Sequence, residues 1–67
     1  MIANDRELQV TLDRIADFQK QVVYLRGVIT DPENYRLSAG GFISEIEKMQ
    51  REVGDYLRHH PSELASA

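Results

Sequence analysis

Cysteine is absent from this chain of 67 residues. Its absence excludes disulfide bonds and thiolate metal sites, and it is compatible with a cytoplasmic protein. No apolar run approaches the roughly 20 residues that a helix needs to span a bilayer. The opening residues 1–7 are too polar for a secretory signal. From these absences we expect a cytoplasmic location.

An excess of basic residues is missing as well. Eight lysines and arginines stand against eleven acidic residues, which gives a net charge of −3. Nucleic-acid binding draws much of its affinity from neutralising phosphates, so free-standing binding of this kind is disfavoured. The apolar fraction, 42%, is nevertheless too high for a disordered tail. A core of this size rarely supplies more than about 3–5 kcal/mol, so we expect stability to come from self-association or docking.

The strongest pattern present is an apolar stripe in the second half of the chain. Its members follow one another in alternating steps of four and three, the spacing of an α-helix that packs along one seam. Two further apolar residues, Ile43 and Leu57, widen the stripe. The opposite side is charged, as expected for a surface helix. The stripe itself consists of Phe42, Ile46, Met49, Val53 and Tyr56.

A second stripe with the same spacing lies in the first half. It comprises Ile15, Phe18, Val22, Leu25 and Ile29, with Leu12 on its flank. Gln19 and Arg26 fall on its edge, in the column of Leu12. They are either side chains that extend from the boundary of the stripe into water, or polar contacts that set the register of an interface.

The beginning of the first helix has two interpretations. An extended arm could precede a helix capped by Thr11, with Asp13 in its first turn. A helix that begins at Asp5 is the alternative. We favour the first and predict a helix over about residues 12–29.

The second helix is predicted over about residues 39–59, after a loop at 30–38. Pro32 disfavours helical backbone at Asp31, and Ser38 is a plausible N-cap. Gly40 and Gly41 either delay this helix or allow another helix to approach closely, and an early helix with close packing is favoured. Pro61 ends the helix, which leaves a frayed tail at 61–67.

Two helices of matched length joined by one loop predict an all-α fold, an antiparallel two-helix hairpin in a single domain of residues 1–67. One shared seam covers only part of the apolar width of each helix. The economical solution is two hairpins that form a four-helix bundle, and therefore a homodimer. The predicted interface residues are Leu12, Ile15, Phe18, Val22, Leu25, Ile29, Phe42, Ile43, Ile46, Met49, Val53, Tyr56 and Leu57.

No group of residues predicts an active site. His59 and His60 are adjacent, so on a helix they point about 100° apart and do not chelate from one face. The serines have no histidine placed as a base, and the glycine pair lacks the lysine of a phosphate-binding loop. We therefore expect no catalytic, cofactor-binding or metal-binding residues, and no enzyme.

The opening residues 1–11, with Phe18 and Leu25 downstream, resemble a group of small bacterial helical hairpins. These precede the helix-turn-helix domain in Xre-type regulators and in antitoxins of toxin–antitoxin operons. Glu45, Ile46 and Glu47 are similar to the second helix of that group. The resemblance implies a dimerising or partner-docking element. It implies no DNA contact, because no recognition helix follows Pro61.

These observations favour a non-enzymatic interaction module that acts as a homodimer. An antitoxin-like or regulatory partner protein is the more specific hypothesis, with a cognate toxin as one candidate partner. The alternative is a small nucleic-acid-associated transcriptional regulator whose basic patches form only in the dimer. No membrane contact is expected.

Overall fold

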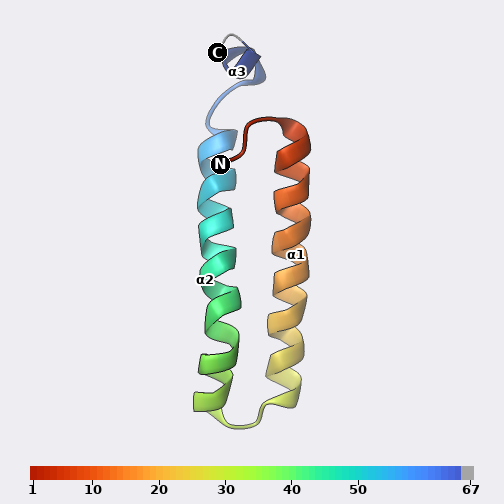
Figure 1. Ribbon diagram of the computed structural model, residues 1–67, viewed down its shortest axis with the longest axis vertical. Coiled ribbons are helices and arrows are strands. Elements are labelled where there is room, and N and C mark those ends of the chain that lie inside the picture. The colour runs from red at the N-terminus through yellow and green to blue at the C-terminus, as the bar shows by residue number, and fades with distance from the viewer. Residues whose placement is uncertain (66–67) are drawn as a thin grey trace.

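The computed structural model describes residues 1–65, and two long helices dominate it (Figure 1). Helix α1 spans Asp5–Val28, helix α2 spans Pro32–Leu57, and a short helix α3 spans Pro61–Ala65. Helices α1 and α2 run antiparallel and pack along their length, which confirms the all-α hairpin. The result is a rod with extents of 51 × 15 × 12 Å.

Helix α1 begins at Asp5, so the predicted extended arm with a Thr11 cap is wrong and the alternative start is observed. The side chain of Asn4 accepts a hydrogen bond from the Glu7 backbone N–H at 2.9 Å. The Glu7 carboxylate in turn accepts one from the Ala3 N–H at 2.8 Å. These bonds resemble a capping box, and the bond to Asn4 satisfies one of the N–H groups that the first turn leaves free. Thr11 instead donates its hydroxyl to the Glu7 carbonyl inside the helix.

The connection between the helices is residues 29–31, which corrects the predicted loop at 30–38 and the predicted start of the second helix near residue 39. Asp31 is the N-cap of α2, and its carboxylate accepts a hydrogen bond from the Asn34 N–H at 3.1 Å. Pro32 occupies the first helical turn, where its missing N–H costs nothing. The same Asp-Pro pair that ends one helix therefore starts the next, and Ser38 lies inside α2 rather than at its cap.

Helix α2 ends at Leu57, slightly before the predicted end. Pro61 begins α3 instead of a frayed tail, because the His60 carbonyl accepts the Glu63 N–H at 2.9 Å. The part of the predicted tail at residues 66–67 lies outside the described residues.

The glycine pair Gly40-Gly41 lies inside α2, so the expectation of an early helix is confirmed. The expectation of close packing is wrong for the hairpin: a Cβ atom added at either glycine would meet nothing within 4 Å. Both glycines have ordinary helical backbone, since no glycine among the described residues has a positive φ.

The core lies along the line between α1 and α2. Ile15 of α1 packs with Ile46 and Met49 of α2, and partly buried residues extend this cluster. The rings of Phe18 and Phe42 meet edge to face with centroids 5.5 Å apart. The two predicted stripes therefore face each other, as the heptad spacing required.

Candidate interaction surface

The thirteen predicted interface residues divide into two groups. Ten lie along the seam of the hairpin and are buried or half-buried. The other three remain exposed beside the seam: Leu12 and Ile43 at 39% each and Leu57 at 62%. The seam residues thus form the core of one chain, and the exposed ones are the part of the prediction that this core does not use.

Leu12 and Ile43 lie on the same side of the hairpin. Each stands three residues before a buried isoleucine of its own helix, Ile15 or Ile46, and is turned from it by about 60° in the same rotational sense. On two antiparallel helices, the same sense of rotation from the seam leads to the same side. Helical geometry therefore gathers apolar side chains from both helices on one long face.

Val23 and Leu57 extend this face toward the two ends of the rod. Val23 is 67% exposed and follows Ile15 by eight residues, which turns it about 80° in the sense of Leu12. Leu57 lines a shallow hollow together with Leu8 of α1. We call the surface formed by Leu12, Val23, Ile43 and Leu57 the open flank.

Near the centre of the open flank one charged side chain is present, that of Glu47, which is turned about 100° from Ile46 in the same sense. The uncharged polar side chains there are Gln19 of α1 and Gln50 of α2. Arg26 and Arg36 are turned toward the same side near the connection, and neither forms an ion pair within residues 1–65. An apolar strip with polar and charged side chains around it matches the core-and-rim arrangement found in protein–protein interfaces.

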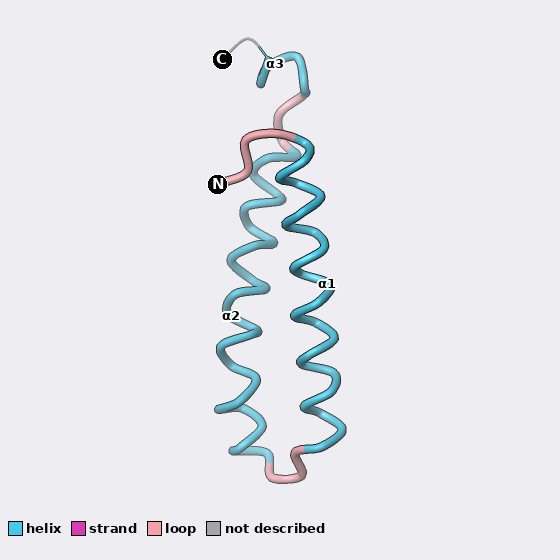
Figure 2. The backbone as a smooth tube through the Cα atoms, turned by 45° about the vertical axis from the view of Figure 1, so that its right-hand side comes forward, coloured by secondary structure: helices cyan, strands magenta, loops and turns pink. Residues whose placement is uncertain are grey.

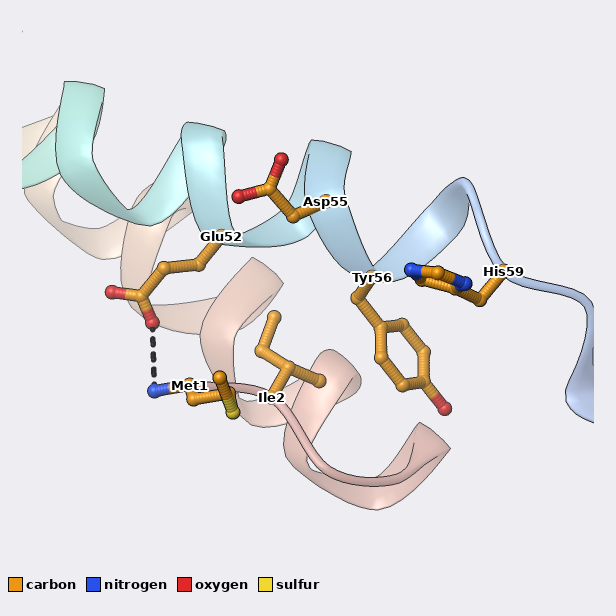
Figure 3. Close-up of a pocket in the computed structure, with 6 residues that line it drawn as sticks. All are labelled: Met1, Ile2, Glu52, Asp55, Tyr56 and His59. Atoms are coloured by element: carbon orange, nitrogen blue, oxygen red, sulfur yellow. Dashed lines mark ion pairs between the residues drawn. The ribbon is translucent and has the colours of Figure 1, made fainter. Parts of the chain in front are cut away.

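The opposite side of the hairpin, which we call the arm flank, is partly covered by the N-terminal residues 1–3. These residues cross from the start of α1 to the end of α2 (Figure 2). Ile2 is buried to 8% exposure, and the Met1 ammonium lies 3.2 Å from the Glu52 carboxylate (Figure 3). Phe18 and Phe42 continue the arm flank, and Arg14 lies over the Phe18 ring.

A polar contact ties the beginning of α1 to the end of α2. The buried Tyr56 donates its hydroxyl to the Asp5 carboxylate at 2.6 Å. This hydrogen bond, with burial and the nearby charges of Asp5 and Glu7, raises the pKa of Tyr56 to about 12. Tyr56 was expected as a seam residue, but its partner was not.

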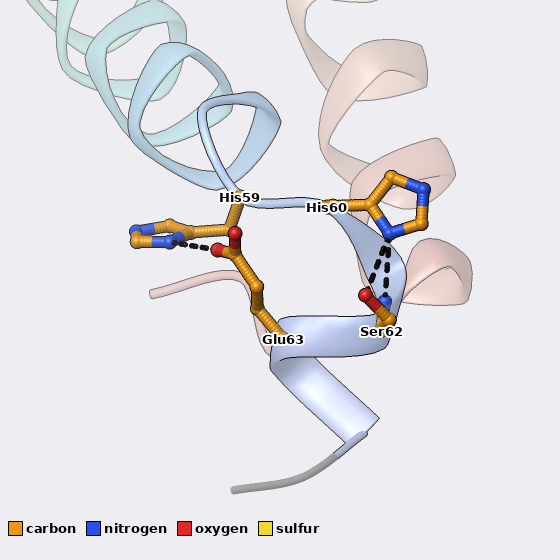
Figure 4. Close-up of polar contacts among 4 residues, drawn as sticks. All are labelled: His59, His60, Ser62 and Glu63. Atoms are coloured by element: carbon orange, nitrogen blue, oxygen red, sulfur yellow. Dashed lines mark hydrogen bonds and ion pairs between the residues drawn. The ribbon is translucent and has the colours of Figure 1, made fainter.

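The two histidines form local contacts with α3 rather than a chelating site (Figure 4). His59 Nδ1 lies 3.2 Å from the Glu63 carboxylate, and His60 Nδ1 lies 2.8 Å from the Ser62 hydroxyl. His60 Nδ1 also accepts the Ser62 backbone N–H at 3.1 Å, as an N-cap acceptor does. Over the described residues, no group of three potential ligands is arranged to hold a metal ion.

Sequence reasoning missed two buried residues, Ile2 and Ala39. Ala39 is completely buried and lies seven residues before Ile46, so the stripe of α2 continues backward through it. That repeat was the signal for the earlier helix start. Ile2 carries no such signal, because its burial depends on contact with residues about 50 positions later in the chain.

No family model, curated protein or solved structure matches the chain. Among the described helices, none combines the length and the apolar character required to cross a membrane.

Proposed function

We propose that this protein is a non-enzymatic interaction module that acts as a homodimer, two hairpins packing into a four-helix bundle. The observation that carries the proposal is the open flank. Apolar side chains from both helices lie on one side of the hairpin, beside Gln19 and Gln50, and they remain 39–67% exposed. Helices of a bundle bury such a face against a second pair of helices.

The exposed area supports this reading. The chain exposes 5269 Å², whereas a compact monomer of 7.7 kDa exposes about 4300 Å² by the usual scaling with mass. The excess, roughly 900 Å², is close to what each partner contributes to a protein–protein interface of standard size. A second hairpin on the open flank would bring the assembly toward the usual ratio.

The small size of the core also supports the proposed homodimer. Among the described residues, no large side chain is completely buried. Each long helix has only one other long helix to pack against. Small chains with such cores and no disulfide or metal are commonly stabilised by association.

Sedimentation equilibrium over a hundredfold dilution tests the proposal. We expect a dimer at high concentration, partial dissociation on dilution, and a melting temperature that rises with protein concentration because folding and association are linked. A folded monomer at every concentration, with a melt that does not depend on concentration, would contradict it.

An antitoxin-like or regulatory role is the more specific part of the proposal, and the resemblance of residues 1–11 to antitoxin hairpins is its support. Co-expression with the product of the neighbouring gene tests it. A stable complex of defined stoichiometry is the expected result. Salt-dependent retention of a DNA fragment by the purified dimer, without such a complex, would favour the nucleic-acid-associated regulator instead.

A further inference from the structure

We infer that the second copy of this chain lies on the open flank with its connection at the opposite end of the rod. A twofold axis perpendicular to the helices, level with Ile43, would relate the two hairpins. Helix α1 then packs against α1 of the second copy, and α2 against α2. This inference rests on the proposed homodimer and adds its orientation and register.

The register follows from contacts within one hairpin. Asp5 bonds to Tyr56, Ile15 packs with Ile46, and the rings of Phe18 and Phe42 meet. These pairs place Ile43 level with α1 residues 17–18, midway between Leu12 and Val23. A twofold axis at that level therefore brings Ile43 against its own copy.

The same axis sets Leu12 of one chain opposite Val23 of the other. Between these two large contacts, Ala16 comes opposite Gln19, a short side chain beside a long one. Three of the four apolar members of the open flank, Leu12, Val23 and Ile43, therefore meet apolar positions, and Gln19 meets a partner that leaves it room. A self-complementary patch of this kind is what a twofold interface requires.

The positions of the charged residues favour this orientation over the main alternative orientation. An axis parallel to the helices would place both connections at the same end and pack α1 against α2 of the second copy. Arg26 of α1 is at the same height along the rod as residue 35 of α2. It would then lie beside Arg36 of the other copy, and the symmetry would create two such arginine pairs. Like charges brought together at an interface are unfavourable.

In the inferred orientation the arginines are separated. Arg36 comes opposite Gln50 of the second copy, within about one helical turn of Glu47. Glu47 forms no ion pair among residues 1–65, so its carboxylate is available to Arg36 of the second copy. The pair would form twice, once on each side of the axis.

Single-cysteine variants test the inference cleanly because the chain has no cysteine of its own. A disulfide requires Cα atoms within about 7 Å, so oxidation reports close pairs only. Ile43→Cys should cross-link to itself. A tagged Leu12→Cys chain mixed with untagged Val23→Cys should give a mixed covalent dimer. Neither of these two variants should cross-link to itself, because Leu12 and its copy would lie about 16 Å apart in the direction of the helices.

Controls make the failure of the orientation distinguishable from the failure of the homodimer. Each variant is first examined by sedimentation under reducing conditions, and Val10→Cys, exposed on the other side of α1, should not cross-link. The inferred orientation would be overturned if Leu12→Cys cross-links to Gln50→Cys, or if dimers form but none of the expected pairs cross-links. In either case the homodimer itself would still be supported. Monomers that do not cross-link would overturn both.

Discussion

The two sides of the hairpin differ in how far their apolar residues are covered by the rest of the chain. On the arm flank, residues 1–3 fold back so that Ile2 is buried, and the Met1 ammonium pairs with the Glu52 carboxylate at the surface. On the open flank, leucine, isoleucine and valine side chains remain exposed with no such cover. A two-helix seam has two open sides, and this chain covers part of only one of them with its own residues. A second molecule would bury the most exposed apolar surface by packing on the other side, the open flank.

Ile46→Asp should have the largest effect, because it removes the core that both flanks share. Ile46 is buried between the helices, and an unpaired charge there should cost about 3–5 kcal/mol. We expect loss of helicity by circular dichroism together with loss of the dimer. Ser44→Asp, an exposed position of the same helix, is the matched control and should remain folded. An Ile46→Asp variant that remains a fully helical dimer would contradict the core described above.

Ile2→Ala should weaken the arm flank alone. Removing a buried isoleucine side chain costs about 2 kcal/mol at the low end of the usual range, and the low end applies because the arm can lift away. The melting temperature should fall at a fixed protein concentration. The mass in sedimentation, measured well below that temperature, should still be that of a dimer. A monomeric Ile2→Ala variant would mean that the arm, rather than the open flank, holds the two copies together.

Gly41→Ala should stabilise the chain. Gly41 is helical, and an added Cβ atom would meet nothing within 4 Å, so only the helix propensity changes. Alanine is favoured over glycine by about 0.5–1 kcal/mol in a helix interior. Chemical denaturation at one protein concentration would measure this gain. Destabilisation would show that something packs on Gly41 in the assembly that one hairpin does not contain.

Tyr56→Phe should have its clearest effect at high pH. The pKa of Tyr56 is raised from 10.0 to about 12 in the folded chain, so folding favours the protonated phenol. The contribution of this group to stability should be complete below pH 10 and should be lost as the pH rises through 12. Denaturation at pH 8 and at pH 11.5 would show a drop for the native chain and a smaller one for Tyr56→Phe. Equal drops would mean that the bond to Asp5 does not form.

The seam was predictable from the sequence because it depends on local spacing. Ile15 and Ile46 lie on stripes whose steps of three and four require one helical face each, and the structure confirms both. The residues at which the helices begin and end were not predictable in the same way. Asn4 and Thr11 both offer a cap in front of a helical pattern, and in the structure Asn4 is the cap while Glu7 accepts a hydrogen bond from Ala3. The Asp31–Pro32 pair signals the end of one helix and the start of the next with equal strength.

The candidate surface was predictable in part. The width of the stripes predicted exposed apolar residues such as Leu12 and Ile43, but not which side of the hairpin would be covered. That depends on the arm, and the burial of Ile2 is a contact between distant parts of the chain that no local pattern encodes.

The most direct test compares Val23→Glu with Val10→Glu by sedimentation equilibrium. Both valines are more than half exposed on α1, but Val23 belongs to the open flank and Val10 lies on the other side. In a lone hairpin neither change should matter. We expect Val23→Glu to raise the dimer dissociation constant by at least about tenfold, which corresponds to about 1.4 kcal/mol, and Val10→Glu to leave it unchanged. Equal dissociation constants for the two variants would contradict the assignment of the open flank as the dimer interface.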